Sequence, residues 1–101
     1  MSLYTEDEIK AEILADKEHI LSQRYPEDLA HEYADNAVPL YYTEIIEEWR
    51  DLGGDYQNCY TEITTELPDR IEDLMRTDLY LYYHSLYSGA IQELLDSQEA
   101  N

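Results

Sequence analysis

The sequence predicts an all-α fold: a compact acidic bundle of four to five helices with a long C-terminal helix. Apolar residues recur every three to four positions along most of the chain, which is the spacing of a buried helix face. The 101 residues include only three Gly and three Pro, which favours long regular elements over loops. This length suits one domain, residues 1–101, and an apolar content of 44% suffices to form a core.

Two helices are expected before residue 38. The first runs from about Thr5 to Gln23, because Thr5 and Glu8 have the Thr-x-x-Glu spacing of a capping box. Pro26 then suits the first position of a second helix, which continues to about Ala37.

A third helix is expected from Pro39 to about Leu52, where Gly53-Gly54 ends it. Its apolar face is formed by Tyr42, Ile45, Ile46, Trp49 and Leu52. Its outer face is acidic and consists of Glu44, Glu47, Glu48 and Asp51. The pattern therefore predicts an amphipathic helix with all four carboxylates in solvent.

The C-terminal half predicts a shorter helix over Asp55–Glu66 and a long one from Pro68 to about Ser97. The β-branched threonines of the shorter segment are also compatible with a strand. Residues 79–87 are apolar nearly all round, so a helix there must be buried on more than one side. Alternation also leaves a strand open for residues 79–83.

No pattern of catalytic or metal-ligating residues is found. Cys59 has no basic neighbour in sequence that could stabilise a thiolate, and a single Cys forms no internal disulfide. His19, His31 and His84 lie in separate segments without the spacing of a ligand pair. A glycine-rich phosphate loop and a calcium-binding loop are also missing from the sequence. We therefore expect no enzyme, no cofactor and no metal site.

The charge excludes several classes of function. Asp and Glu number 24 against 6 Lys and Arg, so the formal charge is −18 and the pI is about 4.1. A polyanion is repelled by nucleic acids and by anionic membranes. No apolar run approaches the length of a membrane span, and the acidic N-terminus does not resemble a signal peptide. A soluble intracellular protein is expected.

The acids are spaced in a way that suggests a use for the charge. Eight acid pairs are spaced i,i+4, against three acid-to-base pairs at the same spacing. The ordinary interpretation is a solvated acidic face. However, i,i+4 residues lie about 6 Å apart along a helix, close to the spacing of phosphates on one DNA strand. For a domain about 30–35 Å across, a charge of −18 equals that of duplex DNA of the same length.

One segment resembles a known family. Ala34-Asp35-Asn36-Ala37-Val38-Pro39-Leu40-Tyr41-Tyr42 is similar to the Ala-Asp-Asn-Ala-Val-Pro-x-Tyr-Tyr segment of the Ocr family. This family consists of phage antirestriction proteins that are small acidic α-helical DNA mimics. Weaker similarity includes Asp28, His31, Glu44-Ile45 and Pro68-Asp69, whereas the nearly neutral C-terminus departs from the family's acidic tail.

The resemblance implies a DNA-mimic inhibitor in the host cytoplasm that competes for the DNA groove of a defence enzyme. A type I restriction–modification complex is the first candidate partner. The alternative is an acidic adaptor that binds one host protein through a Tyr-rich apolar surface. The candidate protein-binding carboxylates are Asp28, Glu32, Asp35, Glu44, Glu47, Glu48, Asp51, Glu62, Glu66, Asp69, Glu72 and Asp73.

A homodimer is also expected, since the apolar segment near residue 80 offers two stripes and one domain core covers only one of them. The candidate interface consists of Leu79, Tyr80, Tyr83 and Tyr87. The helix from Pro39 to Leu52 is an alternative interface, through Tyr41. The dimeric state of the Ocr family supports the expectation.

Overall fold

The computed structural model describes residues 4–53 and 68–99, with side chains given over 4–53 and 72–98. These ranges contain α1 (Glu6–Ala15), α2 (Lys17–Leu21), the 3₁₀ turn η1 (Pro26–Asp28), α3 (Leu29–Ala37), α4 (Tyr42–Asp51) and α6 (Pro68–Glu99). They contain no strand, so the predicted all-α class and the long C-terminal helix are confirmed. The segment predicted as a helix over 55–66 lies outside the described residues.

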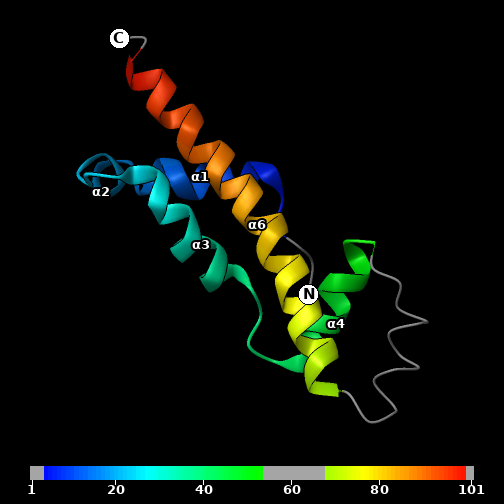
Figure 1. Ribbon diagram of the computed structural model, residues 1–101. Coiled ribbons are helices and arrows are strands. Elements are labelled where there is room, and N and C mark those ends of the chain that lie inside the picture. Colours follow the sequence, from blue (N-terminus) through cyan, green and yellow to red (C-terminus); the bar gives the residue numbers. More distant parts are fainter. Residues whose placement is uncertain (1–3, 54–67, 100–101) are drawn as a thin grey trace.

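Helix α6 is the central element of the fold (Figure 1). Its 32 residues run along the long axis of the molecule, and α1, α3 and α4 each pack against it. The described part measures 55 × 23 × 17 Å, so its long axis exceeds the diameter of about 30–35 Å expected from chain length. The length of α6 sets this shape, because each helical residue adds about 1.5 Å.

The first predicted helix is interrupted. Thr5 caps α1 as expected, and its Oγ1 accepts a hydrogen bond from the Glu8 backbone N–H at 3.2 Å. However, Asp16 leaves helical geometry (φ −98°, ψ 14°), so α1 ends at Ala15 and a short second helix follows. The Asp16 carboxylate accepts a hydrogen bond from Tyr33 at 2.7 Å, which links this turn to α3. The prediction of one continuous helix to Gln23 was wrong.

An extended connector, residues 38–41, joins α3 to α4. Val38 is extended (φ −70°, ψ 129°) because a following proline disfavours helical backbone. The Arg76 guanidinium donates to the carbonyl oxygens of Pro39 and Leu40, at 3.2 and 3.4 Å. Helix α4 therefore begins at Tyr42 rather than at Pro39 as predicted.

The end of α4 agrees with the prediction. The helix ends at Asp51, and Gly53 has a φ of +104°, a left-handed conformation that glycine adopts without steric cost. Its backbone N–H donates to the Arg50 carbonyl at 3.0 Å. The glycine thus terminates the helix.

The core lies between α6 and the three helices around it. Residues 79–83 are helical, so the alternative of a strand there was wrong. Leu79, Tyr83 and Ile91 of α6 are fully buried, together with Ile13 of α1 and Ile45 of α4. Full burial of one such side chain stabilises the fold by about 1.5–3 kcal/mol. No described helix is long and apolar enough to span a membrane.

Candidate functional site

Most of the candidate carboxylates lie on the surface. Those that are exposed are Asp28, Glu32, Asp35, Glu47, Asp51 and Asp73, and Glu44 and Glu72 are half-buried. Asp69 lies in the first turn of α6, but its side chain is outside the described part of the structure, as are Glu62 and Glu66. The described candidates are distributed over η1, α3, α4 and α6, so no single helix carries the charge.

Glu48 was predicted to be a surface carboxylate, and this was wrong. Its side chain is 3% exposed and accepts a hydrogen bond from the Tyr83 hydroxyl at 3.0 Å. Burial raises the pKa of Glu48, and the hydrogen bond from Tyr83 partly opposes this effect. Glu48 therefore belongs to the packing between α4 and α6.

Three exposed carboxylates accept hydrogen bonds from aromatic side chains of other helices. The Tyr87 hydroxyl donates to Glu12 at 2.6 Å, and Tyr33 donates to Asp16 at 2.7 Å. The third donor is the indole N–H of Trp49, which lies 2.9 Å from the Asp78 carboxylate. Each bond fixes the position of a carboxylate without neutralising it, because the donor is uncharged.

Two of these bonds meet at the junction of α1 and α3. The rings of Tyr33 and Tyr87 stack with centroids 5.3 Å apart. Burial and the hydrogen bond to Asp16 raise the pKa of Tyr33, and the nearby charges of Glu12 and Glu32 raise it further. The Tyr33 hydroxyl therefore stays protonated and continues to donate. We call the three carboxylates around it, Glu12, Asp16 and Glu32, the α1–α3 acidic face.

Glu12, Asp16 and Asp78 were not among the predicted site residues. The first two belong to the i,i+4 series that begins at Glu8, so their spacing was visible in the sequence. Composition carried a second signal: the chain has 11 Tyr and no Phe. With 24 acids and only 6 bases, most carboxylates have no cation to pair with. A tyrosine hydroxyl can donate a hydrogen bond to such a carboxylate, whereas phenylalanine has no donor.

Lys10 and Arg76 form ion pairs at the edges of the packing. The Lys10 ammonium lies 3.3 Å from both Glu6 and Glu93, and Arg76 lies 3.0 Å from Glu72. The hydrogen bond from Lys10 to Glu93 is the main cause that raises the Lys10 pKa, so this amine stays protonated. Six bases cannot balance the acids, and the surface remains strongly negative.

The predicted dimer interface is largely inside the protein. Leu79, Tyr83 and Tyr87 are at most 1% exposed, because the chain's own helices cover α6 on several sides, and Tyr80 is half-buried. Placing a partner chain on this stripe was therefore wrong. Among the residues whose side chains the structure describes, the most exposed large apolar ones are Leu40 and Tyr41 of the connector, at 82% and 69%.

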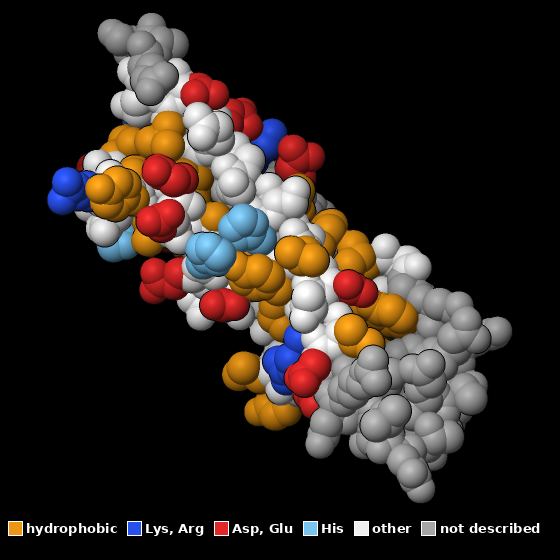
Figure 2. Space-filling model, in the orientation of Figure 1, with side chains coloured by type: hydrophobic (Ala, Val, Ile, Leu, Met, Phe, Trp, Pro, Cys, Tyr) orange, Lys and Arg blue, Asp and Glu red, His pale blue; other side chains and the backbone are white. Residues whose placement is uncertain are grey.

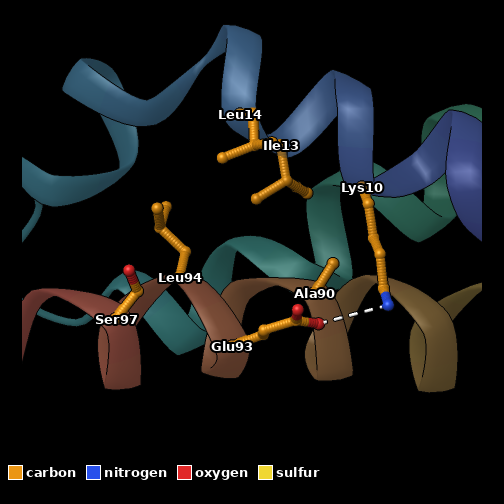
Figure 3. Close-up of a pocket in the computed structure, with 7 residues that line it drawn as sticks. All are labelled: Lys10, Ile13, Leu14, Ala90, Glu93, Leu94 and Ser97. Atoms are coloured by element: carbon orange, nitrogen blue, oxygen red, sulfur yellow. Dashed lines mark ion pairs between the residues drawn. The ribbon is translucent and has the colours of Figure 1, made fainter. Parts of the chain in front are cut away.

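A small cavity of about 170 Å³ lies between α1 and α6 (Figure 3). Ile13 and Leu14 line one side and Ala90 and Leu94 the other, and the Lys10–Glu93 ion pair crosses its end. Small-molecule sites usually occupy about 300–1,000 Å³ and place several polar groups toward the ligand. The lining here is mostly apolar, and its amine is paired with a carboxylate. The cavity is a packing gap at a helix interface.

The charge density of the described shape is below that of duplex DNA. About 55 Å of duplex carries roughly 32 phosphate charges. The described residues contain 21 acids and 6 bases, a formal charge of −15, over a length of 55 Å. The density expected for a diameter of 30–35 Å was too high, and the actual value is close to that of one DNA strand.

Comparison of the chain with family models, curated proteins and solved structures finds no match.

Proposed function

We propose that this protein is a DNA mimic that inhibits a DNA-binding defence enzyme of a bacterial host. Its carboxylates occupy the basic groove that normally holds the phosphates of DNA. The type I restriction–modification complexes are the first candidate target, through the resemblance of Ala34–Tyr42 to the Ocr family. The proposed location is the host cytoplasm, where these complexes act, and the protein itself binds no nucleic acid.

One observation carries the proposal. Exposed carboxylates are fixed by neutral aromatic donors, as in the pairs Tyr87–Glu12 and Tyr33–Asp16. Such a surface keeps its full negative charge, and its acids lose little conformational entropy on binding because they are already positioned. A surface that served solubility alone would not need carboxylates held in fixed places.

The proposed contact surface differs from the predicted set. Glu48 is removed because it is buried, and Glu12, Asp16 and Asp78 are added because they are exposed and fixed. The described members are Glu12, Asp16, Asp28, Glu32, Asp35, Glu44, Glu47, Asp51, Glu72, Asp73 and Asp78. Recognition is spread over many modest contacts, as for DNA in a basic groove.

The alternative is an acidic adaptor that binds one host protein through apolar contacts. Tyr83 and Tyr87 of the Tyr-rich segment are buried, and among the described residues Leu40 and Tyr41 are the most exposed large apolar side chains, so we take these two as the adaptor's candidate contact. An adaptor predicts that Tyr41→Ala abolishes binding to the host protein, whereas loss of several acids matters little. The mimic predicts the reverse.

The test uses two single variants that each remove one glutamate charge. Glu32→Gln changes an exposed acid, and the matched control Glu48→Gln changes a buried one. Inhibition of DNA cleavage by a purified type I complex should weaken about twofold for Glu32→Gln and stay unchanged for Glu48→Gln. A quadruple variant (Asp28→Asn, Glu32→Gln, Glu47→Gln, Asp51→Asn) should lose about tenfold or more. Full inhibition by the quadruple variant contradicts mimicry.

A homodimer is part of the proposal, with its contact moved to the connector. Leu40 and Tyr41 project from it in an exposed position, and apolar contact is needed to offset repulsion between two chains of −18. Sedimentation equilibrium should show a dimer that tightens with added salt and dissociates in Tyr41→Glu. A wild-type monomer at tens of micromolar contradicts this part.

A further inference from the structure

Two histidines that are far apart in sequence meet on the surface between α3 and α6. His31 of α3 is exposed and His84 of α6 is half-buried, and their ring centroids are 4.9 Å apart at an interplanar angle of 45°. Figure 2 shows two adjacent histidine side chains on the visible face, reachable from solvent. We propose that His31 and His84 form a binding site for a divalent transition-metal cation such as Zn²⁺, which bridges the two helices.

The ring separation matches two imidazoles on one metal. A zinc–nitrogen bond of about 2.1 Å places each ring centroid roughly 3.2 Å from the metal. Two rings at a tetrahedral angle then lie about 5 Å apart, and the observed separation is 4.9 Å. Helices α3 and α6 therefore already hold the two rings at the separation that a shared metal requires.

Tyr80 orients the site. Its hydroxyl is hydrogen-bonded to Nδ1 of His31, and its ring stacks on His84 with centroids 5.6 Å apart. In the metal-binding tautomer Nδ1–H donates to the Tyr80 oxygen, which leaves the Nε2 lone pair of His31 free for a cation. A hydrogen bond at the second ring nitrogen is the usual way in which proteins position a histidine ligand.

The charges around the site favour a cation. Asp35 lies beside Tyr80 and Arg76 in the adjoining hollow, and the Arg76 guanidinium is paired with Glu72. The net charge of −18 raises the local concentration of cations at the surface.

The ligands select the type of metal. Imidazole nitrogen suits zinc, copper and nickel, whereas calcium and magnesium prefer oxygen ligands. Within the described residues no group of three His, Cys, Asp or Glu is arranged to hold a metal. Two imidazoles and water are therefore the expected ligands, and binding should be reversible and weaker than at a four-ligand structural site.

The test is calorimetric titration of the full chain with ZnCl₂ at neutral pH in excess Mg²⁺, which occupies carboxylates. The wild type should bind one Zn²⁺ per chain, and His31→Gln and His84→Gln should each lose that site. His19→Gln is the matched control, because His19 is an exposed histidine of α2 outside the pair, and it should bind like the wild type. Tyr80→Phe should bind roughly tenfold more weakly, since His31 loses its orienting hydrogen bond.

A thermal melt of the same proteins gives a second readout. Saturating Zn²⁺ should raise the Tm of the wild type and of His19→Gln, because the metal binds the folded protein and joins α3 to α6. The Tm of the double variant His31→Gln/His84→Gln should not change with Zn²⁺. Equal Zn²⁺ binding by the double variant and the wild type overturns the proposal, as does the absence of a Zn²⁺ site in the wild type. Tyr80→Phe with wild-type affinity overturns the role given to Tyr80.

Discussion

Tyrosines on two consecutive turns of α6 each donate a hydrogen bond to a carboxylate, but the two carboxylates lie in different environments. Tyr83 donates to Glu48 of α4, and Tyr87, one turn later, donates to Glu12 of α1. Both tyrosines are fully buried, but Glu48 is 3% exposed while Glu12 lies in solvent. One pair hides a charge in the packing and the other holds a charge at the surface. A tyrosine–carboxylate bond can therefore either stabilise the packing or position a charge at the surface, depending on whether the acid is buried or exposed.

The difference follows from the faces that the helices turn toward α6. Glu48 is three residues after Ile45 and four before Leu52, so it lies within the apolar stripe of α4. Glu12 lies beside the buried Ile13 and Ile9 of α1 but at the edge of their contact with α6. The edge position leaves part of the Glu12 carboxylate open to water or to a partner.

The largest effect is expected from Tyr83→Phe. This change removes the donor to a buried carboxylate, and such a loss costs about 2 kcal/mol of folding stability. Urea denaturation at neutral pH measures it. A loss below about 0.5 kcal/mol means that Glu48 has another adequate donor, and it removes the contrast between the two pairs.

A smaller effect is expected from Tyr87→Phe. Glu12 is exposed, so water replaces the lost hydroxyl and the free energy of unfolding falls by less than about 1 kcal/mol. The same denaturation series provides the comparison with Tyr83→Phe. Equal losses for the two variants contradict the distinction between a buried and a displayed carboxylate.

The smallest effect concerns pH. Because burial raises the pKa of Glu48, the folded state binds more protons than the unfolded state, and stability from this group falls as pH rises through the folded pKa. The Glu48→Gln side chain does not titrate, and its amide oxygen can still accept the hydrogen bond from Tyr83. The stability of Glu48→Gln relative to the wild type should therefore increase between about pH 4.5 and 7. If the relative stability of Glu48→Gln is independent of pH, or decreases as the pH rises, the raised pKa of Glu48 is contradicted.

Local patterns predicted most of the fold. The Thr5 cap and the left-handed Gly53 each act within a few residues, so the sequence shows them directly. Pro26 opens a 3₁₀ turn, η1, and α3 itself begins at Leu29 rather than at Pro26 as predicted. The interruption at Asp16 and the extended connector before Tyr42 depend on Tyr33 and Arg76, which contact them from elsewhere in the chain. A local sequence pattern cannot reveal these contacts, because each joins residues that are far apart in the chain.

The candidate site was predicted less well, for a similar reason. Exposure of α3 acids such as Glu32 and Asp35 follows from helical periodicity, but the partners of Glu48 and Glu12 are separated from them by 35 and 75 residues. The sequence predicts a dimer contact for the apolar segment near Tyr83 because no local pattern shows which helices of the same chain cover it. Only the high number of tyrosines pointed to hydroxyl donors in the core.

The most direct test of DNA mimicry is a displacement titration. A fluorescently labelled duplex bound to a purified type I restriction–modification complex is titrated with this protein at several salt concentrations, and anisotropy reports the bound DNA. Mimicry predicts that the duplex is fully released and that the affinity of the protein falls steeply with added salt, as for DNA itself. A duplex that stays bound while the protein also binds, or an affinity that is indifferent to salt, contradicts mimicry and favours the adaptor.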